Sequence, residues 1–250
     1  MNFALILVTL SAVTGGLALA DRFYFSHKPG HPWFKKTLVQ ACAFFPVFIT
    51  VLVLRSFLLE PFRIPSGSLE PTLRIGDFLL VNKFIYGLRL PVWEKEIFSI
   101  KKPHLGDIVV FRWPTDPRFD YIKRVVGCPG DSIQYHHKQL IINGTLIKQR
   151  FIRETIDESS SRVVSEYQET LNGIKHRIYI RPGAAAEDFD IRVPPHHYFM
   201  MGDNRDDSSD SRFWGFVDES YLRGKAFMVW MSWDNQSWSV RWSRIGRLIH

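Results

Sequence analysis

Two long apolar segments lie near the N-terminus of the chain. Residues 1–20 contain no charged side chain, and residues 38–59 are apolar except for a few positions such as Gln40. Each segment is long enough to cross a hydrocarbon core of about 30 Å as a helix. Pro46 is tolerated in a membrane helix, and Arg55 lies close enough to the segment end to reach the membrane surface. The pattern predicts two N-terminal transmembrane helices.

The segment between these helices, residues 21–37, is basic. It carries four lysines and arginines against one acidic side chain, Asp21. The positive-inside rule places such a loop in the cytoplasm. Both termini, and everything after Glu60, then lie on the exported side. We therefore expect a multi-pass protein of the cytoplasmic (inner) membrane with a periplasmic domain.

A cleaved signal peptide is the alternative interpretation of the first segment, because residues 18–20 (Ala-Leu-Ala) have the small side chains of a cleavage site. Signal peptides carry their positive charge before the apolar stretch. Here the basic side chains follow it, and residues 1–3 bring only the terminal amine. This order favours an uncleaved helix.

Beyond Pro61 the pattern changes to short β-branched and aromatic runs, which are typical of strands. The clearest runs are residues 77–81, 107–111 and 121–126. Asn143-Gly144 and Asn172-Gly173 each predict a tight hairpin. Three serines at 159–161 predict a loop tip. We expect a mostly β domain with a core of residues 60–133 and 193–250 and a β-hairpin insertion over 134–192.

Composition adds limits on the class of protein. Of the 250 residues, 46% are hydrophobic and 23% charged, which argues against wholesale disorder, and two cysteines are too few for a disulfide-built scaffold. Residues 61–250 carry 27 basic and 23 acidic groups. This net charge of +4 is too mild to indicate a nucleic-acid partner.

The C-terminal tail combines aromatic and basic side chains. Its members are Trp230, Trp233, Trp238, Trp242, Arg241, Arg244 and Arg247. Such a stretch can stack on single-stranded nucleic acid or settle at a bilayer surface. For an exported domain we expect contact with membrane lipid and not with nucleic acid. A core strand remains the alternative for the first two tryptophans.

Three short stretches carry candidate chemistry. Ser66-Gly67-Ser68, between two prolines, offers an exposed hydroxyl on a tight turn, as a serine nucleophile needs. Lys123 interrupts an apolar strand, where desolvation would lower its pKa and let it act as a base. The acidic loop 202–215 does not have the spacing of an EF-hand, so Asp210 and Arg212 are interpreted as a structural ion pair.

Together, and in this order after two membrane helices, the three stretches resemble type I bacterial signal peptidase, a membrane-bound serine protease with a Ser–Lys dyad. The resemblance spans roughly residues 38–133 and 194–233. It implies an exported catalytic domain with the β fold shared by signal peptidases and self-cleaving repressor proteases, attached to two transmembrane helices.

The resemblance also implies a role for each matching position. Ser68 matches the nucleophile, Lys123 matches the general base, and Ser66 matches the hydroxyl that joins the Ser68 backbone N–H in the oxyanion hole. The positions that match the support of the dyad are Ser208, which orients the lysine, the ion pair of Asp210 and Arg212, and the structural box Gly202, Asp203, Asn204 and Arg205. The positions that match the substrate pockets are Phe62, Ile64, Leu69, Leu73, Tyr121 and Ile122. Leu69 stands where the family usually has methionine, a swap that nearly preserves volume.

The implied reaction is removal of signal peptides from exported preproteins, through pockets that admit small side chains at positions −1 and −3. Leu59 and Ser68 are at most about 30 Å apart along the chain, so the site must lie close to the outer membrane surface. The mechanism needs no metal and no cofactor. The adjacent pairs His136-His137 and His196-His197 make poor metal sites, because neighbours on a strand point to opposite faces.

Two alternatives remain for the function. A self-cleaving repressor or related protease shares the Ser–Lys dyad and the fold, although such proteins are soluble with a DNA-binding head. A non-catalytic exported module with a membrane anchor is the other alternative, and it requires an intact dyad to be idle.

Overall fold

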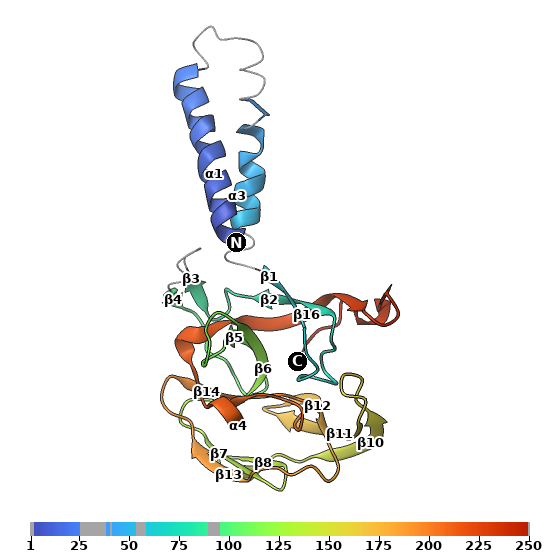
Figure 1. Cartoon of the computed structure of the whole chain (residues 1–250). Coiled ribbons are helices and arrows are strands. Elements are labelled where there is room, and N and C mark those ends of the chain that lie inside the picture. The colour runs from blue at the N-terminus through green and yellow to red at the C-terminus, as the bar shows by residue number, and fades with distance from the viewer. Residues whose placement is uncertain (1–2, 26–38, 41, 54–58, 90–95, 250) are drawn as a thin grey trace. The chain divides into compact units, whose positions relative to one another are not determined.

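The structure is a computed structural model, and it describes residues 3–25, 39–40, 42–53, 59–89 and 96–249 (Figure 1). The chain divides into two compact units. One contains residues 1–59 and 87–99, and the other contains residues 60–86 and 100–250.

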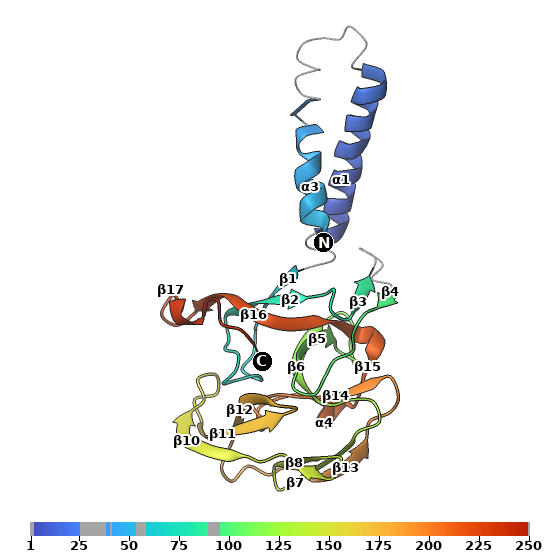
Figure 2. The same ribbon diagram turned by 180° about the vertical axis from the view of Figure 1, so that it is seen from behind.

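The first unit contains helix α1 (Phe3–Ala20), a π-helical turn η1 (Asp21–Phe25), helix α3 (Phe45–Val53) and the hairpin β3 (Gly87–Arg89) with β4 (Glu96–Ser99). Helices α1 and α3 lie side by side (Figures 1 and 2). Gly15 permits this approach, because a Cβ there would overlap the Phe45 ring. Inside α1 the Thr14 hydroxyl donates to the Leu10 carbonyl at 2.7 Å, which satisfies a polar group in an apolar helix.

The described residues contain one helical stretch that is long and apolar enough to span a membrane, Leu5–Phe23. The second expected span, residues 38–59, contains α3 as its longest described helix, which is too short to cross a bilayer. The rest of that span includes residues 54–58, which lie outside the described residues, as does most of the basic loop. The N-terminal apolar helix is therefore confirmed, and the second transmembrane helix stays a prediction.

The second unit is built on a curled eight-stranded sheet with the order β1-β2-β16-β5-β6-β14-β15, and β17 pairs with β16. The strands are β1 (Leu59–Arg63), β2 (Asp77–Asn82), β5 (Ile108–Arg112), β6 (Asp120–Gly127), β14 (His197–Met201), β15 (Val217–Asp218), β16 (Leu222–Asp234) and β17 (Ser239–Val240). The three strands expected from the pattern are β2, β5 and β6. The expectation of a mostly β domain is confirmed.

Two smaller sheets accompany the main sheet in the same unit. They comprise β7 (Ser132–His136), β8 (Gln139–Ile142), β9 (Thr145–Leu146) and β13 (Phe189–Arg192), and β10 (Arg150–Ile156), β11 (Val163–Leu171) and β12 (Ile174–Ile180). Both predicted Asn-Gly hairpins are confirmed: Asn143 and Asn172 have φ of 50° and 48°, and the glycines that follow are also positive, as a type I′ turn requires.

Apolar clusters join these sheets. One contains Leu69, Leu73, Leu79 and Val229, so it connects the loop after β1 with β2 and β16. Another contains Val126 and Phe199 from the main sheet together with Ile133 and Leu171 from the two smaller sheets. The region 134–192 is therefore packed onto the core by shared side chains.

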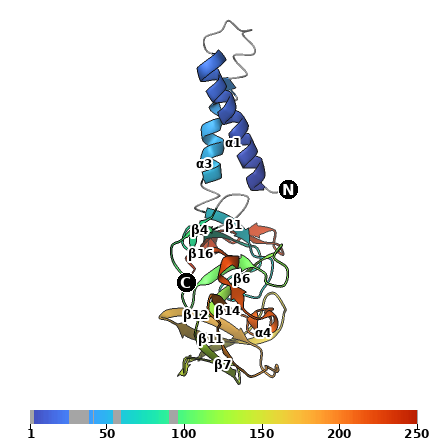
Figure 3. The same ribbon diagram turned by 90° about the vertical axis from the view of Figure 1, so that its left-hand side faces the viewer.

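The remaining short helices are α4 (Ser211–Trp214), η3 (Glu219–Tyr221) and η4 (Trp242–Arg244). Figure 3 shows α4 beside β14. The Ser211 hydroxyl accepts a hydrogen bond from the Met200 N–H at 2.9 Å, which ties the helix to that strand.

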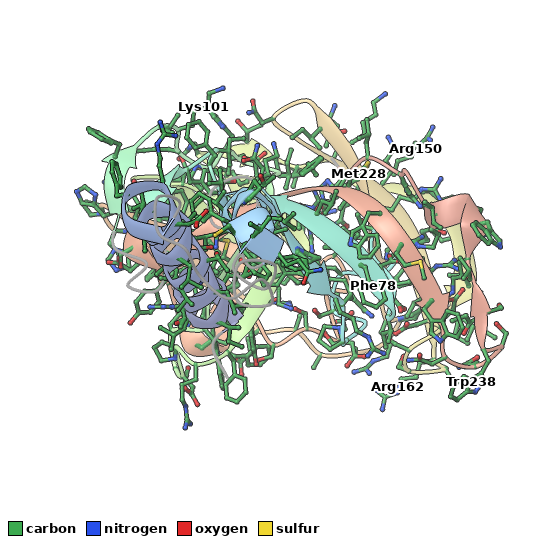
Figure 4. The ribbon with its side chains drawn as sticks, turned by 90° about the horizontal axis from the view of Figure 1, so that it is seen from above. Phe78, Lys101, Arg150, Arg162, Met228 and Trp238 are labelled. Carbon is green, nitrogen blue, oxygen red and sulfur yellow. The ribbon has the colours of Figure 1, made fainter. Side chains whose placement is uncertain are left out.

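The C-terminal tail is only partly the exposed aromatic and basic surface that its sequence indicates. Trp238 and Trp242 are each 77% exposed, and Figure 4 shows Trp238 at the rim of the second unit. Arg244, in contrast, is buried, and its Nε and Nη2 atoms donate to the Asp77 carboxylate at 2.8 and 2.5 Å. The expectation that Arg244 contacts lipid is therefore wrong, because Asp77 at the start of β2 holds its charge inside the fold.

Replacing Arg244 by alanine should lower the free energy of unfolding by about 3–5 kcal/mol, because it leaves the Asp77 carboxylate buried and unpaired. Thermal and denaturant unfolding of the purified chain measure this change. Arg247→Ala is the matched control: Arg247 is exposed, so the loss should stay within about 0.5 kcal/mol. Equal losses for the two variants would contradict a structural role for Arg244.

Candidate active site

The turn formed by residues 66–68 lies in the segment between β1 and β2. It is anchored at its start, where the Ile64 N–H donates to the Asp77 carbonyl at 2.8 Å. After the turn, Leu69 and Leu73 are buried in the apolar cluster beneath it. The apolar positions on both sides of the serines therefore hold the turn in place.

Lys123 reaches this turn from β6, where it lies opposite Val109 of β5. Its Nζ atom is 2.5 Å from Ser68 Oγ, within hydrogen-bond distance. Lys123 is 4% exposed and Ser68 is 8% exposed. The structure thus brings together two candidate residues that are far apart in the sequence, at a place with little access to water.

Burial lowers the pKa of Lys123 to about 8, because the charged amine loses water. The carboxylates of Asp210 and Asp203 act in the opposite direction, and the Arg212 guanidinium lowers the pKa further. With a pKa near 8, about one lysine in ten is neutral at pH 7, against about one in 2,500 for an unperturbed side chain. A neutral amine can accept the serine proton.

Ser66 lies beside the same hydroxyl: its Oγ atom is 3.3 Å from Ser68 Oγ. The Ser66 side chain and the Ser68 backbone N–H are the two donors expected at an oxyanion hole. The Ser66 hydroxyl therefore lies next to the site of attack, while the role of both donors in an oxyanion hole stays a prediction.

Asp210 and Arg212 form the expected ion pair. Asp210 accepts from Arg212 Nε at 2.8 Å and from Arg212 Nη2 at 2.8 Å, and it caps α4. The Asp210 carboxylate also accepts a hydrogen bond from the Gly202 N–H at 3.0 Å. The pair therefore fixes the loop between β14 and α4, which runs past the Ser–Lys contact.

Ser208 belongs to this loop but does not make the expected hydrogen bond. Among the described residues, its buried Oγ atom has no hydrogen-bond partner, Lys123 included. A Cβ at Gly202 would overlap both Ser208 Oγ and the Ser68 carbonyl oxygen. Gly202 thus allows Ser208 to approach the turn of residues 66–68, and orientation of the lysine by Ser208 stays a prediction.

The other residues of the box each support the site through a buried contact. Asp203 binds Arg124 Nε at 2.8 Å and accepts the Thr72 hydroxyl at 2.5 Å. Asn204 N–H donates to the Ser68 carbonyl at 3.2 Å. Arg205 pairs with Glu169 on β11, with Nη1 and Oε1 2.9 Å apart. Residues 202–205 therefore connect the turn of residues 66–68 to β6 and to the smaller sheets.

Five of the six expected pocket residues gather in one place. Ile64, Leu69 and Leu73 belong to one buried cluster, and Phe62 and Ile122 pack against it. Tyr121 lies with a different cluster, and its ring stacks on Trp113 with centroids 5.0 Å apart. Tyr121 and Ile122 are neighbours on a strand and so point to opposite faces.

Several supporting residues escaped the sequence analysis. They are Glu70, Thr72, Arg124, Asp157 and Glu169. Only Arg124 could have been found from the sequence. It follows Lys123 on an apolar strand, and because neighbours on a strand point to opposite faces, each face of the sheet receives one of the two cations. The partners of the others lie far away in the sequence, and nothing in their local pattern indicates them.

The two adjacent histidine pairs take part in surface ion pairs. His136 Nε2 lies 3.0 Å from Asp190 and His196 Nδ1 lies 3.1 Å from Glu219. Within the residues that the structure describes, no three histidine, cysteine, aspartate or glutamate side chains converge as possible metal ligands.

A serine hydroxyl in contact with a buried lysine amine, on a curled β-sheet, is the arrangement of a hydrolase that uses a serine nucleophile and a lysine base. Residues 36–233 match the family described as signal peptidase, peptidase S26. The signal peptidase I of Pseudomonas aeruginosa is 43% identical over all of this chain and 99% of its own length, and that of Pseudomonas fluorescens is 42% identical over 98% of each chain.

A crystal structure of a signal peptidase I from Enterococcus faecalis is 30% identical and covers 51% of this chain and 98% of its own, with a TM-score of 0.35. The full-length sequence relatives decide the assignment. The chain belongs to the signal peptidase family, peptidase S26.

The charges around Lys123 predict opposite effects of two substitutions on the rate profile. Asp210→Asn removes a carboxylate that raises the pKa of Lys123, so the acid limb of kcat/KM should move below pH 8. Arg212→Gln removes a cation that lowers this pKa, so the limb should move above pH 8. Peptide cleavage by each variant, measured from pH 5 to 10, gives the pH of its acid limb.

Asp116→Asn is the control for a general effect of charge, because Asp116 pairs with exposed Arg118 on a surface loop. It should leave the acid limb in place. A shift in the same direction for Asp210→Asn and Arg212→Gln, with both variants folded, would show that the limb does not report Lys123.

Proposed function

We propose that the chain is a signal peptidase I that removes N-terminal signal peptides from exported preproteins, with Ser68 as nucleophile and neutral Lys123 as general base. Its family makes it a serine endopeptidase. The observation that carries the assignment of residues is the 2.5 Å contact between Ser68 Oγ and a lysine amine that burial keeps partly neutral.

In the first half of the reaction, Lys123 Nζ accepts the Ser68 proton while Oγ attacks the scissile carbonyl carbon. The oxyanion that forms is stabilised by the Ser68 N–H and the Ser66 hydroxyl. As the C–N bond breaks, the Lys123 ammonium returns its proton to the leaving amine. This leaves the signal peptide as an ester on Ser68.

In the second half, neutral Lys123 takes a proton from a water molecule, which attacks the ester. The ammonium then protonates Ser68 Oγ as it leaves, and the free enzyme is restored. One amine thus serves as base and acid in both halves, which is possible only when its pKa lies near the working pH.

Specificity for small side chains at positions −1 and −3 of the preprotein is supported by the cluster around the nucleophile turn. Ile64, Leu69 and Leu73 are buried there, and apolar side chains close to Ser68 favour apolar over charged side chains in the substrate. Leu69 in place of the usual methionine keeps the wall apolar and of similar volume.

Attachment to the membrane is supported by the apolar helix over Leu5–Phe23. We place a second span over residues 38–59, a cytoplasmic loop over residues 21–37, and the catalytic domain on the periplasmic side. Lipid is a further partner, and the exposed Trp238 and Trp242 are side chains suited to a membrane surface.

The two alternative functions are less well supported. A self-cleaving repressor does not account for an apolar N-terminal helix or for relatives that match over the full chain length. A non-catalytic module does not account for a buried lysine amine in contact with a serine hydroxyl, because burying the amine lowers the stability of the fold and such a module gains nothing from it.

Lys123→Arg should reduce kcat about 100- to 10,000-fold, because guanidinium stays protonated and cannot accept the Ser68 proton. Ser68→Ala should be equally inactive. Cleavage of a purified preprotein by the full chain measures both rates.

Lys101→Arg is the matched control for the exchange of cations, since Lys101 lies at the surface of the second unit (Figure 4). It should cleave at the wild-type rate. Substantial activity of Lys123→Arg would mean that the lysine is only a structural cation and that another group is the base.

Topology is tested by reporter fusions within residues 21–37 and after His250. The loop fusion should be active in the cytoplasm and the C-terminal fusion on the exported side, because basic loops stay inside. Recovery of a mature chain that begins at Asp21 would instead favour the cleaved signal peptide.

A further inference from the structure

A buried carboxyl group that the reaction does not use lies next to the nucleophile. Glu70 follows Ser68 by two residues and is 3% exposed. Its backbone N–H donates to the Gly67 carbonyl at 3.0 Å, which closes the nucleophile turn. Its carboxyl group is hydrogen-bonded to the carboxyl group of Asp157, which is 1% exposed.

Asp157 begins a short loop, residues 157–161, between β10 and β11, and it accepts several hydrogen bonds within that loop. Its oxygens accept the Ser159 N–H at 3.0 Å, the Ser159 hydroxyl at 2.9 Å and the Ser160 hydroxyl at 2.6 Å. A Cβ at Gly67 would overlap Ser159 Oγ, so this loop lies directly on the nucleophile turn.

The other charged and titratable side chains that face the pair are Arg74, Glu158, Tyr179, Asp234 and Arg241. The two arginines among them are engaged by other acids. Arg74 lies 3.1 Å from Glu158 and Arg241 lies 3.3 Å from Asp234. Two touching, buried carboxyl groups in such surroundings cannot both be ionised at low cost, so one keeps a proton.

The pair connects to the oxyanion hole through Asn204. The Asn204 Nδ2 group donates to Asp157 Oδ2 at 3.1 Å and to the Gly67 carbonyl at 3.3 Å. The Gly67 carbonyl and the Ser68 N–H belong to one planar peptide unit. Whatever holds that carbonyl therefore also sets the direction of the N–H expected to bind the oxyanion.

We propose that Glu70 and Asp157 share one proton, and that this proton makes Glu70 a positioning residue for the catalytic turn. The protonated Glu70 carboxyl donates to the Asp157 carboxylate. Asp157 in turn orients the Asn204 amide, and the amide holds the Gly67–Ser68 peptide with its N–H toward the reacting carbonyl.

The pair has a defined response to pH. Burial raises the pKa of Glu70 to about 8, and the hydrogen bond to Asp157 and its negative charge add to the rise. Burial alone would also raise the pKa of Asp157, but hydrogen bonds from Glu70, Ser160 and Asn204 hold it below the usual range. Above pH 8 both groups are ionised and repel each other, which releases the Asn204 amide and loosens the turn.

The inference rests on the proposed function, since it concerns the positioning of Ser68. It predicts that the alkaline limb of the rate profile belongs to Glu70, while the acid limb belongs to Lys123. In the wild type, kcat should fall at least about tenfold between its maximum and pH 10, with a smaller change in KM.

Glu70→Gln tests this directly, because the glutamine amide donates to Asp157 at every pH. The variant should keep the acid limb and lose the alkaline limb. Glu154→Gln, the same exchange at an exposed glutamate on β10, is the matched control and should keep the wild-type profile. An unchanged alkaline limb in Glu70→Gln would overturn the proposal.

A second measurement does not depend on the variant. In the full-length wild type with ¹³C-labelled glutamate side chains, one carboxyl carbon should titrate near pH 8. If every glutamate titrates below pH 6, the shared proton does not exist and the proposal fails. Ser68→Ala in the same cleavage assay tests the proposed function separately, because the glutamate titration persists whether or not Ser68 is the nucleophile.

Discussion

The contact between Lys123 Nζ and Ser68 Oγ depends on keeping a lysine amine almost free of water. β6 places Lys123 in the middle of the curled sheet, and the turn between β1 and β2 covers it with Ser68. The apolar clusters around these elements lower the pKa of the amine, while Asp210 and Asp203 limit the drop. The buried ion pairs near the site, such as Arg124 with Asp203, do not contact the reacting atoms. They hold in place the segments that surround the Lys123 amine.

Two buried groups near the nucleophile give opposite contributions to stability as pH changes. The lowered pKa of Lys123 means that its burial destabilises the fold below about pH 8, and this penalty disappears as pH rises toward 10.5. The raised pKa of Glu70 means that its contribution is complete below about pH 4.5 and is lost as pH rises through about 8. Neutral Lys123, which catalysis needs, and protonated Glu70, which keeps the turn ordered, therefore coexist only in a window around pH 8.

Local pattern sufficed for the strands and the two Asn-Gly hairpins, since each depends on residues close together in the sequence. The three stretches that meet at the site are weak signals one by one, and only their resemblance to signal peptidase joins them. It could not reveal the partners of isolated charged side chains. The sequence indicates a surface position for Arg244, whereas in the structure the Asp77 carboxylate on β2 pairs with it. The sequence likewise indicates no more than a turn position for Glu70, whereas residues 157–161 cover it in the structure. Such pairings are set by which segments the sheets bring together, and the sequence pattern carries no trace of them.

The Ser68–Lys123 mechanism is tested most directly by titrating the Lys123 amine itself, followed by ¹⁵N NMR of the full chain labelled at lysine Nζ and assigned with Lys123→Ala. The mechanism predicts one lysine that loses its proton near pH 8 and whose signal is absent from Lys123→Ala. If every lysine retains its proton to about pH 10, as unperturbed side chains do, then burial does not make Lys123 a base and the Ser68–Lys123 mechanism is contradicted.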